Sequence, residues 1–177
     1  FFLKMRFFEK FLIFFHKPKY LFNFNSGISR YKKLKKLVGE YDVIVLHSIQ
    51  NIIFPDEIVK LSEDLEIKIV MRPLDMELIT GGCHFNFNCN KWKESCDNCY
   101  QLKSQGVKNP SRKIFASKKL SYSKIPIHWI APNNFIKNRL IESPLTSSEH
   151  QFSSIFLGID ENRFKKVDKS IARDQLS

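Results

Sequence analysis

A long hydrophobic run free of charged residues is absent from this chain of 177 residues. The most apolar stretch, residues 1–16, is rich in phenylalanine but is interrupted by Lys4, Arg6, Glu9 and Lys10. Because a membrane-spanning helix needs about 20 predominantly apolar residues, this stretch is too charged to span a bilayer. It also lacks a small-residue cleavage site, so we do not expect it to act as a secretory signal.

Acidic residues are scarce in the first part of the chain. Residues 1–40 contain two acidic residues, Glu9 and Glu40, and hold eight of the eleven net positive charges. A basic segment that contains aromatic residues can face nucleic acid, an anionic membrane surface or water. Phenylalanine is the commonest aromatic residue here and lysine outnumbers arginine. This composition favours contact with a lipid interface over sequence-specific contact with nucleic-acid bases.

The opening stretch predicts a helix. Its apolar stripe has alternating spacings of four and three residues and consists of Phe1, Met5, Phe8, Leu12 and Phe15. Further phenylalanines widen this stripe, as in helices that lie on a bilayer or are wedged against a domain. We expect residues 1–19 to form an amphipathic basic and aromatic helix that contacts an anionic membrane surface, with a partly exposed core helix as the alternative.

The middle of the chain alternates between strand and helix patterns, and its length suits one domain rather than two Rossmann domains. Helix patterns cover residues 31–38, 55–65, 111–121 and 135–142, and strand patterns cover residues 20–25, 42–47, 67–71, 127–131 and 151–157. The runs at 42–47 and 67–71 are continuously apolar, as in buried parallel strands. This rhythm predicts an α/β fold with a Rossmann-like open parallel sheet and flanking helices.

Polar residues follow two successive predicted strands. Ligands of open parallel sheets bind outside the carboxyl ends of the strands, which is where His47, Arg72 and Asp75 are expected. Next come Thr80, Gly81 and Gly82, where two glycines permit amide groups to turn towards a ligand. The alternatives are structural: Asp75 caps a turn, Arg72 pairs with a nearby acid, and His47 or His84 makes an ordinary loop hydrogen bond.

All four cysteines lie in one irregular loop, residues 80–102, called the cysteine-rich loop below. This loop contains too few aliphatic residues to fold around a core of its own. Cys96 and Cys99 have the spacing of a zinc knuckle, whereas Cys83 and Cys89 are separated by five residues. A structural zinc ion, one or two disulfides, and reduced packed thiols all remain possible states of the four cysteines.

The same loop carries a resemblance to a known family. Asp75-Met76, the run from Thr80 to Phe85, Lys91-Trp92 and Gln101-Leu102, together with the cysteines, resemble the signature HDMWPFTGGCHY…C.KW…C.NCPQL. This is the signature of bacterial family 4 glycosyltransferases that build cell-surface polysaccharides. A second similar stretch begins at Gly158-Ile159-Asp160 and continues through Phe164, Asp168 and Ala172-Arg173. Leu74 stands where that family often has histidine, and Tyr100 where proline is usual.

The resemblance implies an incomplete GT-B enzyme. Residues 20–157 would form its Rossmann-like amino-terminal domain, and residues 158–177 would begin the linker to a missing donor domain. That missing domain would bind most of the nucleotide-sugar donor, so we expect this chain alone to be inactive. The full-length parent would transfer a hexosyl group, with retention, to a lipid-linked or glycan acceptor.

The resemblance also implies the site and its location. The acceptor-binding residues would be His47, Arg72, Asp75, Thr80, Gly81, Gly82, His84 and Asn133, and no catalytic residue is assigned. We expect a cytoplasmic protein peripheral to the inner face of the cell membrane. The rival interpretation is a basic nucleic-acid-binding module with a zinc knuckle at Cys83, Cys89, Cys96 and Cys99. A zinc-knuckle module of this kind does not need buried parallel strands. We therefore expect no nucleic-acid partner.

Overall fold

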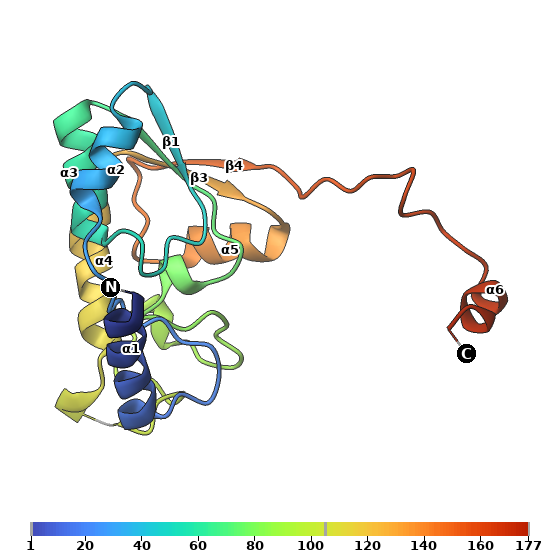
Figure 1. Cartoon of the computed structure of the whole chain (residues 1–177), viewed down its shortest axis with the longest axis horizontal. Coiled ribbons are helices and arrows are strands. Elements are labelled where there is room, and N and C mark those ends of the chain that lie inside the picture. The colour runs from blue at the N-terminus through green and yellow to red at the C-terminus, as the bar shows by residue number, and fades with distance from the viewer. Residues whose placement is uncertain (1, 105, 177) are drawn as a thin grey trace.

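The computed structural model describes residues 2–104 and 106–176 and contains a four-stranded parallel sheet (Figure 1). The strands β1 (Val43–Leu46), β2 (Lys68–Met71), β3 (Ile127–Ala131) and β4 (Gln151–Ser154) lie side by side in the order β1-β2-β3-β4. All three strand pairs are parallel. The prediction of an α/β fold with an open parallel sheet and flanking helices is therefore confirmed.

Five of the described helices agree closely with the sequence patterns, and a sixth, at residues 169–174, was not predicted. They are α1 (Phe2–His16), α2 (Tyr31–Val38), α3 (Pro55–Leu65), α4 (Ser111–Tyr122), α5 (Asn134–Glu142) and α6 (Lys169–Asp174). The helix α3 begins at a proline, whose missing N–H is not needed in the first turn. Short 3₁₀ turns η1 (Glu77–Ile79), η2 (Lys91–Lys93) and η3 (Gly106–Lys108) occur between β2 and α4.

One face of the sheet packs against the helices. Met71 of β2 and Trp129 of β3 are completely buried there. They belong to one apolar core with Ile58 and Leu61 of α3 and with Ile136 of α5. Each of these side chains lies on the inward stripe of its element, so the core follows directly from the apolar pattern of the sequence.

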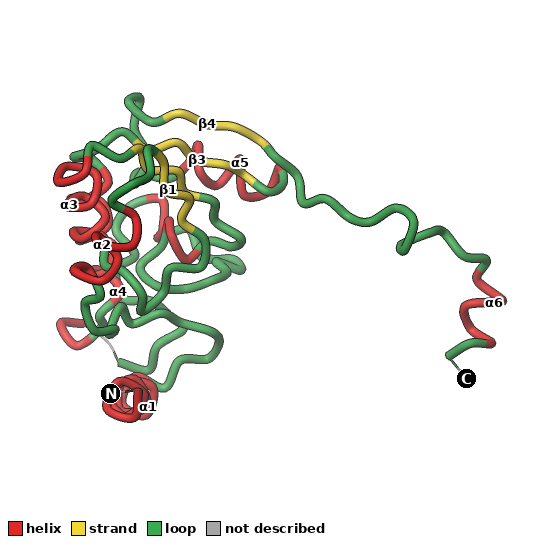
Figure 2. Tube along the Cα trace, turned by 45° about the horizontal axis from the view of Figure 1, so that its top comes forward, coloured by secondary structure: helices red, strands yellow, loops and turns green. Residues whose placement is uncertain are grey.

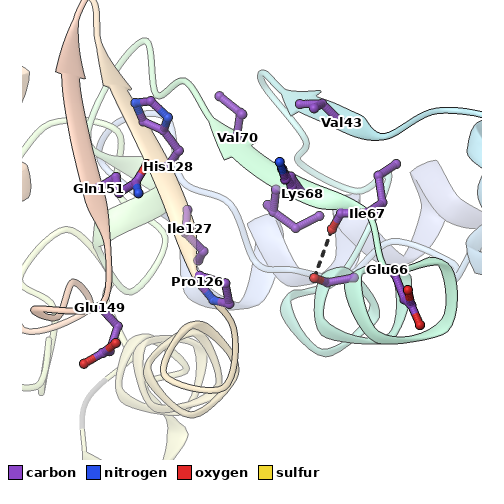
Figure 3. Close-up of a pocket in the computed structure, with 12 residues that line it drawn as sticks. Val43, Glu66, Ile67, Lys68, Val70, Pro126, Ile127, His128, Glu149 and Gln151 are labelled. Carbon is purple, nitrogen blue, oxygen red and sulfur yellow. Dashed lines mark hydrogen bonds between the residues drawn. The ribbon is translucent and has the colours of Figure 1, made fainter.

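The other face of the sheet is open, contrary to the expectation of strands buried on both sides. Val43 and Val45 of β1 are 45% and 48% exposed. Their side chains stand on the same side of the sheet as Val70 and His128, as Figure 3 shows for Val43, Val70 and His128. In the described part of the chain, helices cover only one face of the sheet, so the strands are not buried on both sides. A cavity of about 530 Å³ lies at the amino ends of the strands.

The strand predicted at residues 20–25 is wrong. This segment makes one antiparallel bridge, between Phe22 and Cys83, and joins no sheet. Phe22 and Phe24 are buried in a second apolar cluster with Leu102 and two of the cysteines. The segment is extended because it packs along the cysteine-rich loop, which has no regular strand to pair with it.

Loops with short helical turns make up much of the part of the molecule between the sheet and α1 (Figure 2). At the other end of the chain, β4 stops at Ser154, three residues before the predicted limit. The segment 155–176 then extends away from the sheet and carries α6 (Figure 1). Its apolar residues, including Phe156 and Leu157, are exposed, so this segment adds nothing to the core.

Candidate functional site

The carboxyl ends of β1 and β2 bring His47 and Arg72 together along the backbone. Leu46 is paired with Met71, and the Arg72 N–H donates to the Leu46 carbonyl at 3.0 Å. His47 and Arg72 therefore leave neighbouring strands at the same edge. His47 is exposed and Arg72 is half-buried, so both lie at the surface of this edge.

Asn133 follows the carboxyl end of β3 and has a structural role in this conformation. Its side-chain oxygen accepts a hydrogen bond from the Ile136 N–H at 2.8 Å and so caps α5. An asparagine at this position satisfies one of the free amide groups of the first helical turn. The side chain is exposed and remains at the edge of the sheet.

Asp75 and His84 form a pair at the start of the cysteine-rich loop. The Nδ1 atom of His84 lies 2.7 Å from Oδ2 of Asp75, and the other carboxylate oxygen accepts from the Glu77 N–H at 2.8 Å. The backbone closes the same turn, since the Met76 N–H donates to the His84 carbonyl. Because a carboxylate accepts, Nδ1 carries the proton, and Nε2 is the ring nitrogen left for a further partner.

The segment Thr80, Gly81 and Gly82 lies in the interior, so its amides do not turn towards a ligand as expected. The Gly81 N–H donates to Cys96 Sγ at 3.1 Å, and the Gly82 N–H donates to the Thr80 hydroxyl. Thr80 is completely buried. The two glycines are needed for close packing instead: a Cβ on Gly81 would lie 2.3 Å from the Ser111 carbonyl oxygen.

Glu77 connects this turn to the rest of the molecule. Its carboxylate pairs with Lys118 of α4 at 2.7 Å, with both side chains almost completely buried. The same carboxylate accepts from Asn23 at 2.8 Å and from Gln50, in the loop after β1, at 3.3 Å. Lys118 also donates to the carbonyl oxygens of Glu77 and Thr80. We call Glu77, Lys118, Asn23 and Gln50 the polar cluster.

Sequence reasoning missed the polar cluster, although a signal for Lys118 was present. The buried positions of α4 include Ile114, Phe115 and Tyr122, and Lys118 falls on the same helical stripe. A lysine on an apolar stripe needs a buried anion, because an unpaired buried charge is strongly destabilising. Glu77 lies three residues before the cysteine-rich loop, but the sequence alone could not identify it as the partner of Lys118.

The four thiols face a common small cavity within the cysteine-rich loop. All four are free, and Cys83, Cys96 and Cys99 are buried. A hydrogen bond from the Cys83 thiol lowers the pKa of Cys99 to about 7, and the same bond raises the pKa of Cys83. Burial raises the pKa of Cys96 to about 12. Within residues 2–104 and 106–176, no three metal-binding side chains are arranged to hold one ion.

The cysteine-rich loop also packs against α5. Lys93 pairs with Glu142 at 3.0 Å, and the Arg139 guanidinium lies 5.4 Å from the centre of the Trp92 ring. Trp92 itself is buried in the main core. The loop thus follows β2 by way of η1 and is attached to the last turns of α5.

These features define an α/β protein with a polar site at the carboxyl edge of an open parallel sheet. In comparisons with known proteins, no family model, no curated protein and no solved structure matches the chain.

Proposed function

We propose that the carboxyl edge of the sheet forms the acceptor side of a sugar-transferring site. A nucleotide sugar would be held mainly by a separate donor-binding domain, and the sugar would pass with retention to a lipid-linked or glycan acceptor in cell-surface polysaccharide synthesis. The proposal rests on the resemblance of the cysteine-rich loop to family 4 glycosyltransferases. It is supported by one geometric observation: His47 and Arg72 leave neighbouring strands at the same edge, and Asp75 follows Arg72 by three residues.

The residues at this edge suit the binding of a phosphate-linked sugar. Arg72 is half-buried and offers a fixed fork of N–H donors, which is the preferred partner of a phosphate. Asp75 orients the ring of His84, which is only 8% exposed, so this pair would hold the turn beside the acceptor. Fixing an acceptor in the correct orientation is itself a large part of catalysis. Thr80, Gly81 and Gly82 would contribute by shaping the loop from inside.

Binding of a defined acceptor tests the proposal. The probe is a polyprenyl diphosphate that carries one sugar, dissolved in detergent micelles, and the readout is its dissociation constant. We expect Arg72→Ala to weaken binding about tenfold or more, because a hydrogen bond between charged groups is lost. His47→Ala should weaken it less, since His47 is exposed.

Matched controls come from the same chain. Arg112→Ala removes an arginine with a 70% exposed side chain on α4, and His128→Ala removes a histidine on the open face of the sheet. Both should bind the probe as the unchanged protein does. Failure of the unchanged protein to bind, or equal losses for Arg72→Ala and Arg112→Ala, would remove the support for an acceptor site at this edge.

The cysteines have a part in the same proposal, as ligands of one structural zinc ion that fixes the loop. All four line one cavity, and the N–H of Gly81 donates to Cys96 as amides do to metal-bound thiolates. The side chains would have to close around the ion, because they do not form a metal site as they stand.

Metal analysis of the purified protein separates the three states of the cysteines. We expect one zinc ion per chain, lost in Cys89→Ser and retained in Ser95→Ala, a change in the same loop. Counting of thiols in denaturant with a metal chelator and without reductant provides the second measurement. Two or four missing thiols would indicate disulfides, and four reactive thiols in a metal-free protein would indicate reduced packing; either result contradicts zinc binding.

A further inference from the structure

Large apolar side chains are exposed on α1, on the residues that follow it and on the cysteine-rich loop. Each is between 40% and 72% exposed, and together they are called the aromatic surface: Phe11, Ile13, Phe14, Phe15, Tyr20, Leu21, Phe85, Phe87 and Tyr100. Most of them are aromatic. Exposed apolar residues gathered in one place mark a surface that contacts a partner.

The described half of α1 presents one face to the protein and the other to solvent. Leu12 packs against the second apolar cluster, and His16, one turn later, is buried and bonded to Ser104. Phe14 lies between them in sequence and on the opposite side of the helix, where it is 72% exposed. The predicted stripe residues Phe1, Met5 and Phe8 are outside the side chains that the structure describes.

Backbone hydrogen bonds attach α1 to the cysteine-rich loop and to the residues that follow it. The Lys103 N–H donates to the His16 carbonyl, and the Lys19 N–H donates to the Gln101 carbonyl, both at 2.8 Å. The rings of Tyr20 and Phe87 are in contact, with their centres 4.6 Å apart. The helix α1 and the cysteine-rich loop thus lie side by side, below the sheet in Figure 1.

Exposed lysines accompany the aromatic surface: Lys10, Lys17, Lys19, Lys91 and Lys103. Two of them lie over its rings, Lys17 over Phe14 at 5.5 Å and Lys19 over Tyr100 at 5.8 Å. The sequences 10–36 and 78–93 contain no acidic residue. The surface is therefore both apolar and positively charged.

We propose that the aromatic surface docks on an anionic lipid bilayer, with α1 and the cysteine-rich loop in contact with lipid together. Aromatic side chains favour the membrane interface, and lysines near the headgroups are attracted by anionic lipid. No helix in residues 2–104 and 106–176 has the length and apolar character to cross a membrane, so the contact is with the surface. This inference extends the predicted contact of residues 1–19 to a second segment and does not depend on sugar transfer.

Vesicle flotation of the full chain tests the proposal. We expect association with vesicles that contain phosphatidylglycerol, weak association with pure phosphatidylcholine vesicles, and release by salt. Lys17→Gln and Lys91→Gln should each weaken the association about fivefold, following the contribution of one lysine near an anionic surface. Lys165→Gln, in the exposed segment after the sheet, is the matched control and should leave binding unchanged.

A fluorescent probe at each segment shows whether both insert. Phe14→Trp on α1 and Phe87→Trp in the loop replace exposed rings, so the fold should tolerate both changes. We expect the emission of both to shift to the blue with anionic vesicles, whereas Phe156→Trp in the exposed segment should show no shift. A blue shift for Phe14→Trp but not for Phe87→Trp would contradict the proposal that α1 and the cysteine-rich loop contact lipid together. Absence of vesicle binding, or tighter binding of an RNA oligonucleotide than of vesicles, would overturn lipid docking altogether.

Discussion

The sheet with its helices and the cysteine-rich loop are held together by different interactions. In the first region, apolar side chains such as Met71 and Trp129 are completely buried and pack against helices. The second region lacks a regular sheet or long helix, and its turns depend on directional bonds such as those of Thr80 and Gly81. Apolar packing tolerates many sequences, whereas a bonded turn depends on particular residues.

This difference determines what each region can do. The sheet supplies a rigid edge at which His47 and Arg72 are placed by strand register. The loop adds chemistry that strands cannot provide, namely the Asp75–His84 pair and four adjacent thiols. The sheet region therefore contributes most of the buried apolar packing, and the cysteine-rich loop contributes the titratable and thiol groups. The polar cluster connects the two regions.

Removing Lys118 should have the largest effect on stability. Lys118→Met keeps the length of the side chain but leaves the buried Glu77 carboxylate without its cation, which costs about 3–5 kcal/mol in comparable buried pairs. Urea unfolding followed by circular dichroism measures this loss as a lower transition midpoint. The effect should spread to the sheet, since α4 belongs to the main core.

Two further variants show whether the loss comes from the unpaired charge. Lys119→Met changes the next residue of α4, which is exposed, and should alter stability by no more than about 0.5 kcal/mol. Glu77→Gln combined with Lys118→Met removes both charges and should restore part of the stability. Equal effects of Lys118→Met and Lys119→Met would mean that the polar cluster does not connect the two regions.

Much of the sheet region could be predicted from the sequence. Apolar periodicity located α3, α4 and β3 to within one residue, because these elements bury an apolar stripe. The openness of the second sheet face could not be predicted, since a continuous apolar run does not reveal what covers it. The segment 20–25 was wrongly predicted as a strand, because its partner is an irregular loop that periodicity does not reveal.

The candidate site divides in the same way. The adjacency of His47 and Arg72 could be inferred from two parallel strands, as could the position of the loop at their edge. The pairing of Asp75 with His84 and the interior position of Gly81 and Gly82 depend on how the loop folds back on itself. Such contacts are specified by directional bonds between residues distant in sequence, which a local pattern does not contain.

A change at Gly82 should produce a smaller effect that is confined to the loop. This residue has φ +120°, and a Cβ placed on it would lie 2.3 Å from the Asn23 carbonyl oxygen. Gly82→Ala should therefore destabilise the protein by about 1–3 kcal/mol, whereas Gly158→Ala, where a Cβ meets open space, should be nearly neutral. Hydrogen exchange gives the decisive measurement: amides of the cysteine-rich loop should lose protection while those of β2 and β3 keep it. Loss of protection in the strands as well would show that the loop and the sheet unfold as one unit, and that the contrast between the two regions is wrong.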